Sequence, residues 1–238
     1  MTGVSAIIVT RGNVDLQVQV DALPKEWEVL IVNNARGEIV VKSPGDSFVG
    51  EIIKSGLPDL SVYGRYAACE FATYRQIYVQ DDDCIVSDPT RITEAWFEQC
   101  PSISIGWERS YSNQPYHGVV CNMPERFRHS FYEEHALVGF GASFERDAPK
   151  RAFERFWDRQ GWLSHPLGGF KDETEEAVEE RQLFMRTCDM VFTALTERHL
   201  VDVPHEDMPF ASDPDRMWKQ PDHQGDRNRM LDKILTIR

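Results

Sequence analysis

Gln76-Ile77-Tyr78-Val79-Gln80-Asp81-Asp82-Asp83-Cys84-Ile85-Val86 is a short β-prone run that ends in three consecutive carboxylates and resumes with a second apolar pair. Adjacent negative charges repel one another, which costs stability unless a counter-charge is supplied. A hard divalent cation with oxygen ligands, Mg²⁺ or Mn²⁺, would supply it. Because open α/β sheets bind phosphorylated ligands at the carboxyl ends of their strands, this stretch predicts a metal that holds a diphosphate. The alternative is a solvated acidic loop, since the chain has 39 acidic residues.

Strand-like and helix-like segments alternate on both sides of this stretch. Apolar runs of strand length predict strands over residues 4–10, 27–32, 38–42, 76–80, 102–107 and 199–203. Helical patterns cover residues 14–23, 64–74, 89–97, 148–157, 175–187 and about 226–236, and residues 189–195 fit either a strand or a buried helix. The alternation is typical of an α/β protein with a mixed, mostly parallel sheet flanked by helices. No repeat or linker interrupts it, so we expect a single domain over residues 1–238.

Composition indicates a soluble globular protein. Hydrophobic residues make up 41% and charged residues 27% of the 238 positions, and no apolar run approaches the roughly 20 residues of a membrane span. Five scattered cysteines favour reduced thiols, and the N-terminus lacks a signal-peptide pattern, so we expect a cytoplasmic protein. The net charge of −13 argues against broad attachment to nucleic acid or to anionic membranes.

In this order of elements the chain resembles glycosyltransferases of the GT-A fold, which is Rossmann-like. The resemblance rests on the strand 4–10 with the Arg11 that follows it, the strand that ends in Asn33-Asn34, and the Arg65-bearing helix before the acidic triplet. In that family a nucleotide-diphosphate sugar lies across the N-terminal half, and the acidic triplet, called the DXD motif, holds a divalent metal on the diphosphate. The resemblance implies a nucleotide-sugar half over about residues 1–110, an acceptor half over about 111–203 and a tail over about 204–238.

A narrower likeness, over most of residues 4–195, is to exostosin-like transferases. In them a DDD triplet is followed by a helix, a proline turn and a strand that ends near an arginine, as in residues 96–109 here. The later Gly-Ala-Ala-Phe element of that family has a counterpart in Gly141-Ala142-Ser143-Phe144, and its acidic helix start has a looser one in Glu179-Glu180. Gly141-Ala142 would then form the floor under the sugar, with simple core packing as the alternative.

The resemblance implies a role for each acid of the triplet. Asp83 is the expected direct metal ligand, Asp81 reaches the metal directly or through water, and Asp82 faces the ribose or sugar hydroxyls. The metal, Mn²⁺ or Mg²⁺, would neutralise the charge that grows on the departing diphosphate. His205 would complete the metal site after the last strand, and His223 competes for that role. An isolated surface histidine is the alternative for both.

Four further residues are expected to contact the nucleotide. Thr10, Arg11 and Asn33 end strands at the carboxyl edge of the predicted sheet. Arg65 lies just upstream of the triplet and offers a forked set of donors to phosphate or base. A salt-bridged surface arginine is the alternative for both Arg65 and Arg11.

An acid is also needed near the reacting hydroxyl. If the enzyme inverts the anomeric carbon, one Asp or Glu deprotonates the acceptor. If it retains, as exostosin-like enzymes do, the acid lies beneath the sugar and the diphosphate itself can take the proton. Glu180 is the first candidate, ahead of Glu179 and Asp172. Residues 173–180 contain five acids, so a solvated helix face is the alternative for each of them.

The C-terminal tail resembles a lid that folds over the diphosphate and excludes water. It combines cationic, aromatic and imidazole side chains, namely Trp218, Lys219, His223, Arg227 and Arg229.

The sequence therefore predicts a metal-dependent glycosyltransferase that moves a sugar from a nucleotide-diphosphate donor, with UDP as the expected nucleotide, to an acceptor hydroxyl. The acceptor is left open between a glycan, a protein and a hydroxylated DNA base. A sugar-phosphate nucleotidyltransferase is the nearest alternative, but such enzymes carry a glycine-rich basic loop where Thr10-Arg11-Gly12-Asn13 has one glycine. A non-catalytic cation-binding domain would space its acids along a loop, whereas these are contiguous behind a strand.

Overall fold

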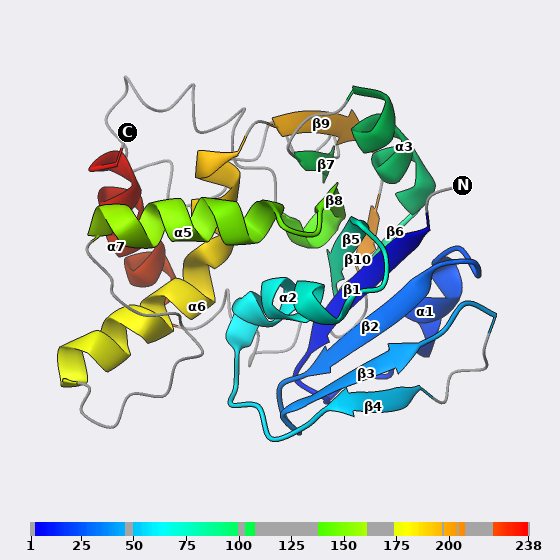
Figure 1. Ribbon diagram of the computed structural model, residues 1–238, viewed down its shortest axis with the longest axis horizontal. Helices are drawn as coiled ribbons and strands as arrows, with labels where there is room; N and C mark the ends of the chain where they lie inside the picture. Colours follow the sequence, from blue (N-terminus) through cyan, green and yellow to red (C-terminus); the bar gives the residue numbers. More distant parts are fainter. Residues whose placement is uncertain are drawn as a thin grey trace.

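The computed structural model describes residues 3–45, 50–99, 103–107, 138–160, 174–196, 198–203, 205–207 and 221–237 (Figure 1). Within these ranges the strands form an eight-stranded sheet in the order β4-β3-β2-β1-β5-β8-β7-β9 and a two-stranded sheet of β10 and β6. The strands are β1 (Val4–Thr10), β2 (Glu28–Asn33), β3 (Glu38–Lys42), β4 (Glu51–Lys54), β5 (Gln76–Asp81), β6 (Cys84–Val86), β7 (Ile103–Trp107), β8 (Ala142–Glu145), β9 (Arg198–Asp202) and β10 (His205–Asp207).

The large sheet is mixed, with most strands pointing the same way. β1 is parallel to β2 and β5, and β7 is parallel to β9. Only β3 and β8, among the described strands, run antiparallel to both of their neighbours. The predicted fold class, an α/β protein with a mixed, mostly parallel sheet, is therefore confirmed.

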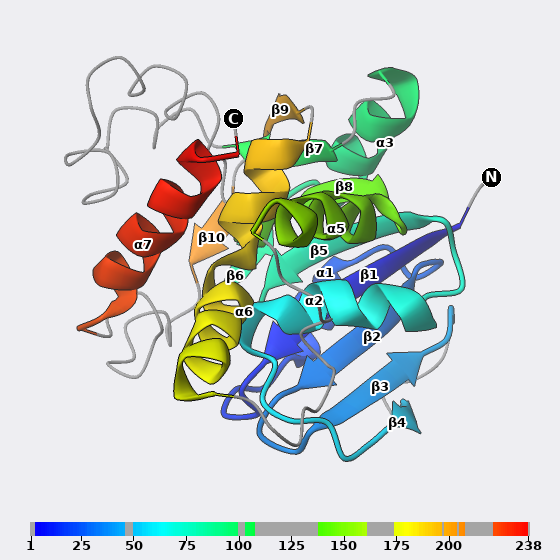
Figure 2. The same cartoon turned by 60° about the vertical axis from the view of Figure 1, so that its left-hand side comes forward.

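Helices cover both faces of this sheet (Figures 1 and 2). They are α1 (Gln17–Ala22), the short turn series η1 (Ser61–Tyr63), α2 (Gly64–Ala67) and η2 (Ala68–Phe71), then α3 (Pro89–Gln99), η4 (Val138–Phe140), α5 (Ala148–Gln160), α6 (Glu175–Leu195) and α7 (His223–Leu235). None of the described helices is both long and apolar enough to cross a membrane.

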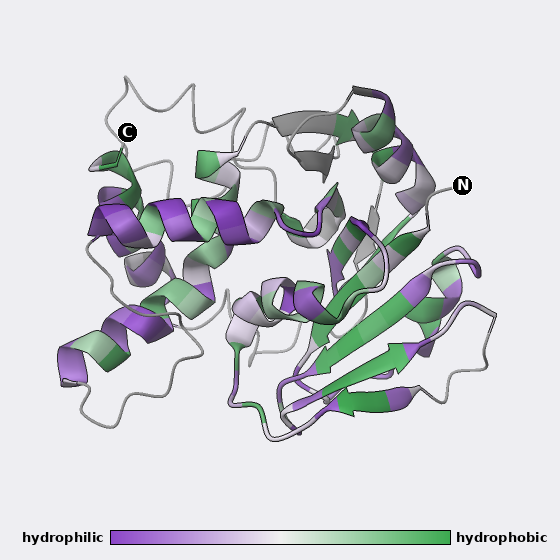
Figure 3. Ribbon diagram, in the orientation of Figure 1, coloured by the Kyte–Doolittle hydropathy of each residue, from purple (hydrophilic) through white to green (hydrophobic). Residues whose placement is uncertain are grey.

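Side chains alternate along β1 between two cores, because successive residues of a strand point to opposite faces. Ile7 belongs to the core that contains the buried side chains of α2, α5, α6 and α7. Ala6 and Ile8 belong to the second core, which Val20 of α1 and Ile92 of α3 complete. Figure 3 shows the same design: β1 and β2 are hydrophobic along their length, whereas α5 carries a hydrophilic outer stripe. A sheet buried on both faces leaves its strand ends as the accessible edge.

The helix predicted over residues 64–74 is shorter than expected and distorted. It ends at Phe71, and Ala72 is extended. The cause is Glu28 of β2, whose carboxylate accepts hydrogen bonds from the Thr73 backbone N–H at 2.9 Å and the Thr73 hydroxyl at 2.6 Å. The same carboxylate accepts a hydrogen bond from Ser5 of β1. A buried acid thus stops the helix and anchors the start of β5.

Residues 175–195 form one continuous helix where the sequence predicted a helix followed by an ambiguous segment. Thr174 caps its start by accepting a hydrogen bond from the backbone N–H of Ala177 at 3.2 Å. The hydroxyls of Thr187 and Thr193 donate hydrogen bonds to backbone carbonyls one turn earlier, so neither residue breaks the helix. Strands β4, β6, β8 and β10 were not predicted.

After β10, the described part of the C-terminal tail is a packed helix, α7. Met230, Leu231 and Ile234 of α7 are buried in the core shared with α6. Arg186 of α6 donates to Asp226 of α7 at 2.7 Å, which adds a polar link between the two helices. Trp218 and Lys219, the other residues of the predicted lid, lie outside the described residues.

Candidate functional site at the carboxyl edge of the sheet

The ends of β1, β2 and β5 meet at one edge, as the sequence predicted. Thr10 is in register with Asn33, and Val9 is in register with Asp81. The first residue of the acidic triplet therefore lies beside the end of β1, and the end of β2 lies on the other side of β1. This is the edge at which open α/β sheets bind their ligands.

The turn after β1 is folded onto the end of β2. The Thr10 hydroxyl accepts from the backbone N–H of Gly12 at 3.1 Å, and the Thr10 carbonyl accepts from the backbone N–H of Asn34 at 2.9 Å. Gly12 has φ +75° and its missing Cβ would lie 2.8 Å from the Asn33 side-chain oxygen, so only glycine suits this position. Thr10 is thus engaged by its own turn, while Arg11 is exposed at the rim.

The second strand end is fixed by Asn34. Its side-chain amide donates to the Ser61 carbonyl at 3.1 Å, and its oxygen accepts from the backbone N–H of Leu60 at 3.3 Å. These bonds hold the segment that precedes α2 against the edge of the sheet. Because α2 carries Arg65, they also fix the backbone position of that arginine.

The three acids of the triplet lie in different environments. Asp81 has 41% of its side-chain surface exposed, and Asp83 is partly exposed. Asp82 is buried, with 5% exposure, and its carbonyl accepts a hydrogen bond from the Gln19 amide of α1 at 2.6 Å. The predicted contact of Asp82 with sugar hydroxyls remains a prediction, and in this structure Asp81 and Asp83 are the triplet acids that reach the solvent.

Arg65 supplies a counter-charge to Asp81. Its Nη2 lies 2.5 Å from Asp81 Oδ1, and its Nη1 lies 3.5 Å from Asp189 Oδ2 on α6. Burial would lower the pKa of the guanidinium, but Asp189 and Asp81 outweigh it and raise that pKa above its ordinary value. The side chain is 2% exposed, so it is a buried cation beneath the edge rather than a surface arginine.

Asp189 is the residue of this site that the sequence analysis missed. Burial raises the pKa of its carboxyl, whereas Arg65 and the hydrogen bond from Tyr66 lower it. The Tyr66 hydroxyl donates to Asp189 Oδ1 at 2.6 Å. A signal was present in the sequence, because Asp189 is a lone acid in the apolar run 188–192, and an acid among buried apolar residues requires a partner.

Two glycines bound the edge on the β8 side. A Cβ at Gly139 would overlap the Asp81 carboxylate. Gly141 has φ +99°, and its Cβ would lie 2.9 Å from the Tyr78 hydroxyl. Ala142 is fully buried and in register with Val79 of β5. The predicted sugar floor at Gly141-Ala142 remains a prediction, and Gly139 is the glycine that packs directly on the triplet.

The small second sheet brings residues 205–207 beside the segment that follows the triplet. In the antiparallel register of β10 and β6, His205 is opposite Val86 and Asp207 is opposite Cys84. Cys84 directly follows Asp83, so by backbone position Asp207 is nearer the triplet than His205 by two residues, or about 7 Å of strand. The metal role of His205 remains a prediction.

Glu180 lies between α6 and α7, and His223 is the partly buried first residue of α7. Burial and Arg227 lower the pKa of His223 to about 4, against the opposing effect of Asp226. Glu180 lies 2.7 Å from Lys233 Nζ and 3.6 Å from Arg229.

The position of Glu180 on α6 separates it from the charged group beneath the edge. It precedes Asp189 by nine residues of the same helix, which is about 13 Å along the axis. Its catalytic role therefore remains a prediction, because the contacts described for Glu180 are with α7 and not with residues of the edge. Glu179 pairs with Arg229 at 2.8 Å, and Asp172 lies outside the described residues.

The donor set at the edge suits Mg²⁺ or Mn²⁺. Within the described ranges, no three His, Cys, Asp or Glu side chains gather into a cation cage. Mg²⁺ does not need one, because it is usually held by one or two carboxylates together with substrate phosphates. The solvent-reaching carboxylates of Asp81 and Asp83 meet that requirement.

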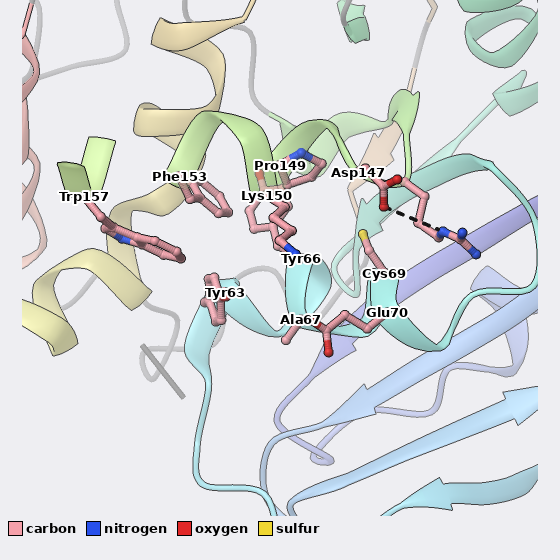
Figure 4. A pocket seen from close by; sticks show the side chains of 11 residues that line it. Tyr63, Tyr66, Ala67, Cys69, Glu70, Asp147, Pro149, Lys150, Phe153 and Trp157 are labelled. Atoms are coloured by element: carbon pink, nitrogen blue, oxygen red, sulfur yellow. Dashed lines mark ion pairs between the residues drawn. The ribbon is translucent and has the colours of Figure 1, made fainter. Parts of the chain in front are cut away.

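A small cavity lies elsewhere, between α2 and α5 (Figure 4). Its volume is about 60 Å³, and Tyr63, Phe153 and Trp157 form its aromatic wall. Ligand pockets for small molecules are typically about 300–1,000 Å³. The cavity is therefore too small for a nucleotide sugar, and the open sheet edge is the better candidate.

No protein-family model matches this chain, and no curated protein matches it. Among solved structures, the crystal structure of S. aureus TarS 1–349 is similar, with a TM-score of 0.46 and 11% sequence identity. The match covers 98% of this chain and 70% of the TarS chain. We transfer neither residue roles nor activity from so distant a match.

Proposed function

We propose that this protein is a metal-dependent glycosyltransferase that moves a sugar from a nucleotide-diphosphate donor to an acceptor hydroxyl. The observation that carries the proposal is the register of β1, β2 and β5, which brings Asp81, the first acid of the triplet, to the same edge of the sheet as Thr10 and Asn33. Such an edge can receive a nucleotide on two strand ends and its diphosphate at the third. The resemblance of the chain to GT-A enzymes points to the same use of these residues.

In this proposal the protein holds the donor and stabilises the leaving group. Asp83 and Asp81 hold Mn²⁺ or Mg²⁺, which supplies Lewis-acid neutralisation of the diphosphate. Arg11 and Asn33 bind the nucleotide, and Arg65 partly neutralises Asp81 through their ion pair. UDP is the first nucleotide to test.

The proposal is tested by screening UDP-, GDP- and TDP-sugars for hydrolysis and for a rise in melting temperature, with Mn²⁺ or with EDTA. We expect one nucleotide class to stabilise the wild type only with metal. Asp83→Ala should abolish that stabilisation and lower hydrolysis at least a hundredfold, because a metal ligand supplies several kcal/mol of charge stabilisation.

Asp158→Ala is the matched control. Asp158 is an exposed aspartate on α5, so its loss should leave both readouts unchanged. If no nucleotide sugar stabilises the wild type, or if Asp83→Ala behaves as Asp158→Ala does, the proposed function is wrong.

A further inference from the structure

Arg65 is held between two carboxylates that come from different parts of the fold. Asp81 ends the central strand β5, whereas Asp189 lies in the second half of α6. The guanidinium approaches Asp81 at 2.5 Å through Nη2 and Asp189 at 3.5 Å through Nη1. Within the described residues neither Nε nor Nη1 makes a hydrogen bond, so the guanidinium is positioned chiefly by these two charges.

One buried cation thus serves two anions. Asp189 partly neutralises the charge of Arg65 through Nη1, so Asp81 is less neutralised than it would be in a simple ion pair with Arg65. Interactions between charges are stronger in a poorly solvated site than in water, and Arg65 is only 2% exposed. The negative potential that Asp81 offers to a cation at the edge therefore depends on the charge of Asp189.

We infer that Asp189 is a positioning residue that sets the affinity of the carboxyl edge for a divalent cation, acting through Arg65. This inference rests on the proposed function, because it assumes a metal at Asp81 and Asp83. Loss of the Asp189 charge leaves the whole charge of Arg65 facing Asp81 and weakens metal binding. Loss of the Arg65 charge has the opposite effect.

A substitution at Tyr66 separates the effect of the Asp189 hydrogen bond from the effect of the Asp189 charge. Its hydroxyl bonds to Asp189 Oδ1 at 2.6 Å, while its ring packs edge-on against Phe153 and Phe192. Tyr66→Phe removes the hydrogen bond and keeps both the ring packing and the charge of Asp189. A purely structural role of the network would respond to this change as strongly as to Asp189→Asn.

The test is a titration of Mn²⁺ followed by electron paramagnetic resonance, with and without UDP, on wild type, Asp189→Asn, Asp189→Glu, Arg65→Gln and Tyr66→Phe. With an effective dielectric constant near 20, we expect Asp189→Asn to raise the Mn²⁺ dissociation constant about three- to tenfold. Arg65→Gln should lower it by a similar factor. Asp189→Glu and Tyr66→Phe should stay within about twofold of wild type.

Opposite shifts for Asp189→Asn and Arg65→Gln support the inference, and shifts in the same direction overturn it. If Arg65→Gln does not fold, the pair Asp189→Asn and Asp189→Glu decides, because a charge effect requires that only the first weaken binding. A wild type that binds no Mn²⁺ with or without UDP contradicts the proposed metal site itself. A wild type that binds Mn²⁺ while Asp189→Asn binds equally well contradicts only the role of Asp189.

Discussion

At the scale of single residues, three consecutive aspartates have become three different groups. Asp81 is paired with a buried arginine, Asp82 is turned into the protein, and Asp83 reaches the solvent. The sequence showed that the charges needed a counter-ion, and a metal was the expected one. Arg65 is a second counter-ion, which the amino-acid sequence alone does not reveal. Its contact with Asp81 depends on how the chain around α2 packs near the end of β5.

The close packing of Gly139 on Asp81 leads to a prediction about stability. Gly139→Ala should destabilise the protein by about 1–3 kcal/mol, because the added methyl group must displace the Asp81 carboxylate from its bond with Arg65. The free energy of unfolding from urea denaturation measures the effect. Gly225→Ala is the control, because nothing lies within 4 Å of its added Cβ in α7, and it should stabilise by about 0.5–1 kcal/mol. Equal stability changes for the two variants would show that Gly139 does not confine Asp81.

At the scale of elements, α6 joins the edge to the C-terminal helix. Asp189, in its second half, belongs to the site, whereas Glu179 and Glu180 in its first half and Arg186 near its middle pair with residues of α7. The hydrophobic pattern predicted the first part as a helix and left residues 189–195 open, because most of them are apolar and period alone cannot separate a buried helix from a strand. Of the residues on which the lid was predicted, His223, Arg227 and Arg229 lie in α7, and the lid role of the tail remains a prediction.

The pKa of His223 predicts how the docking of α7 responds to acid. The value falls from an ordinary 6.5 to about 4 in the folded protein, so below pH 6.5 the unfolded chain binds a proton that the folded one refuses. The stability that neutral His223 permits is therefore full above pH 6.5 and is lost as the pH falls toward 4.

Urea denaturation at pH 7.5 and pH 5 tests this on wild type and His223→Gln. The loss of stability between the two pH values should be smaller in the variant, which has no imidazole to protonate. An identical loss in both proteins would show that His223 titrates normally in the folded state.

At the scale of the whole molecule, local patterns predicted most of the strands and their shared edge. β1 and β3 have the predicted bounds, and β2, β5, β7 and β9 differ from theirs by one residue at one or both ends. Their apolar runs are long enough to specify a buried strand by themselves. β4, β6, β8 and β10 were not predicted. They are short, and they form because neighbouring strands supply hydrogen bonds, which a single segment does not encode.

The residues of the candidate site also divide into those that the sequence predicts and those that depend on tertiary packing. Thr10, Asn33 and Asp81 were predictable because parallel strands that follow one another end at the same edge. Asp189 reaches Arg65 across more than a hundred residues, and only the packing of α6 on α2 brings the two together.

The most direct test of the account is the calorimetric affinity of the wild-type protein for UDP, measured with Mn²⁺ and again with EDTA. The account predicts that UDP binds with Mn²⁺ and that chelation weakens binding at least tenfold, since the metal joins the diphosphate to Asp81 and Asp83. GDP and TDP titrated in the same way establish whether another nucleotide replaces UDP. Binding of none of the three, or binding that EDTA leaves unchanged, would contradict the central claim that the acidic edge holds a metal-bound nucleotide diphosphate.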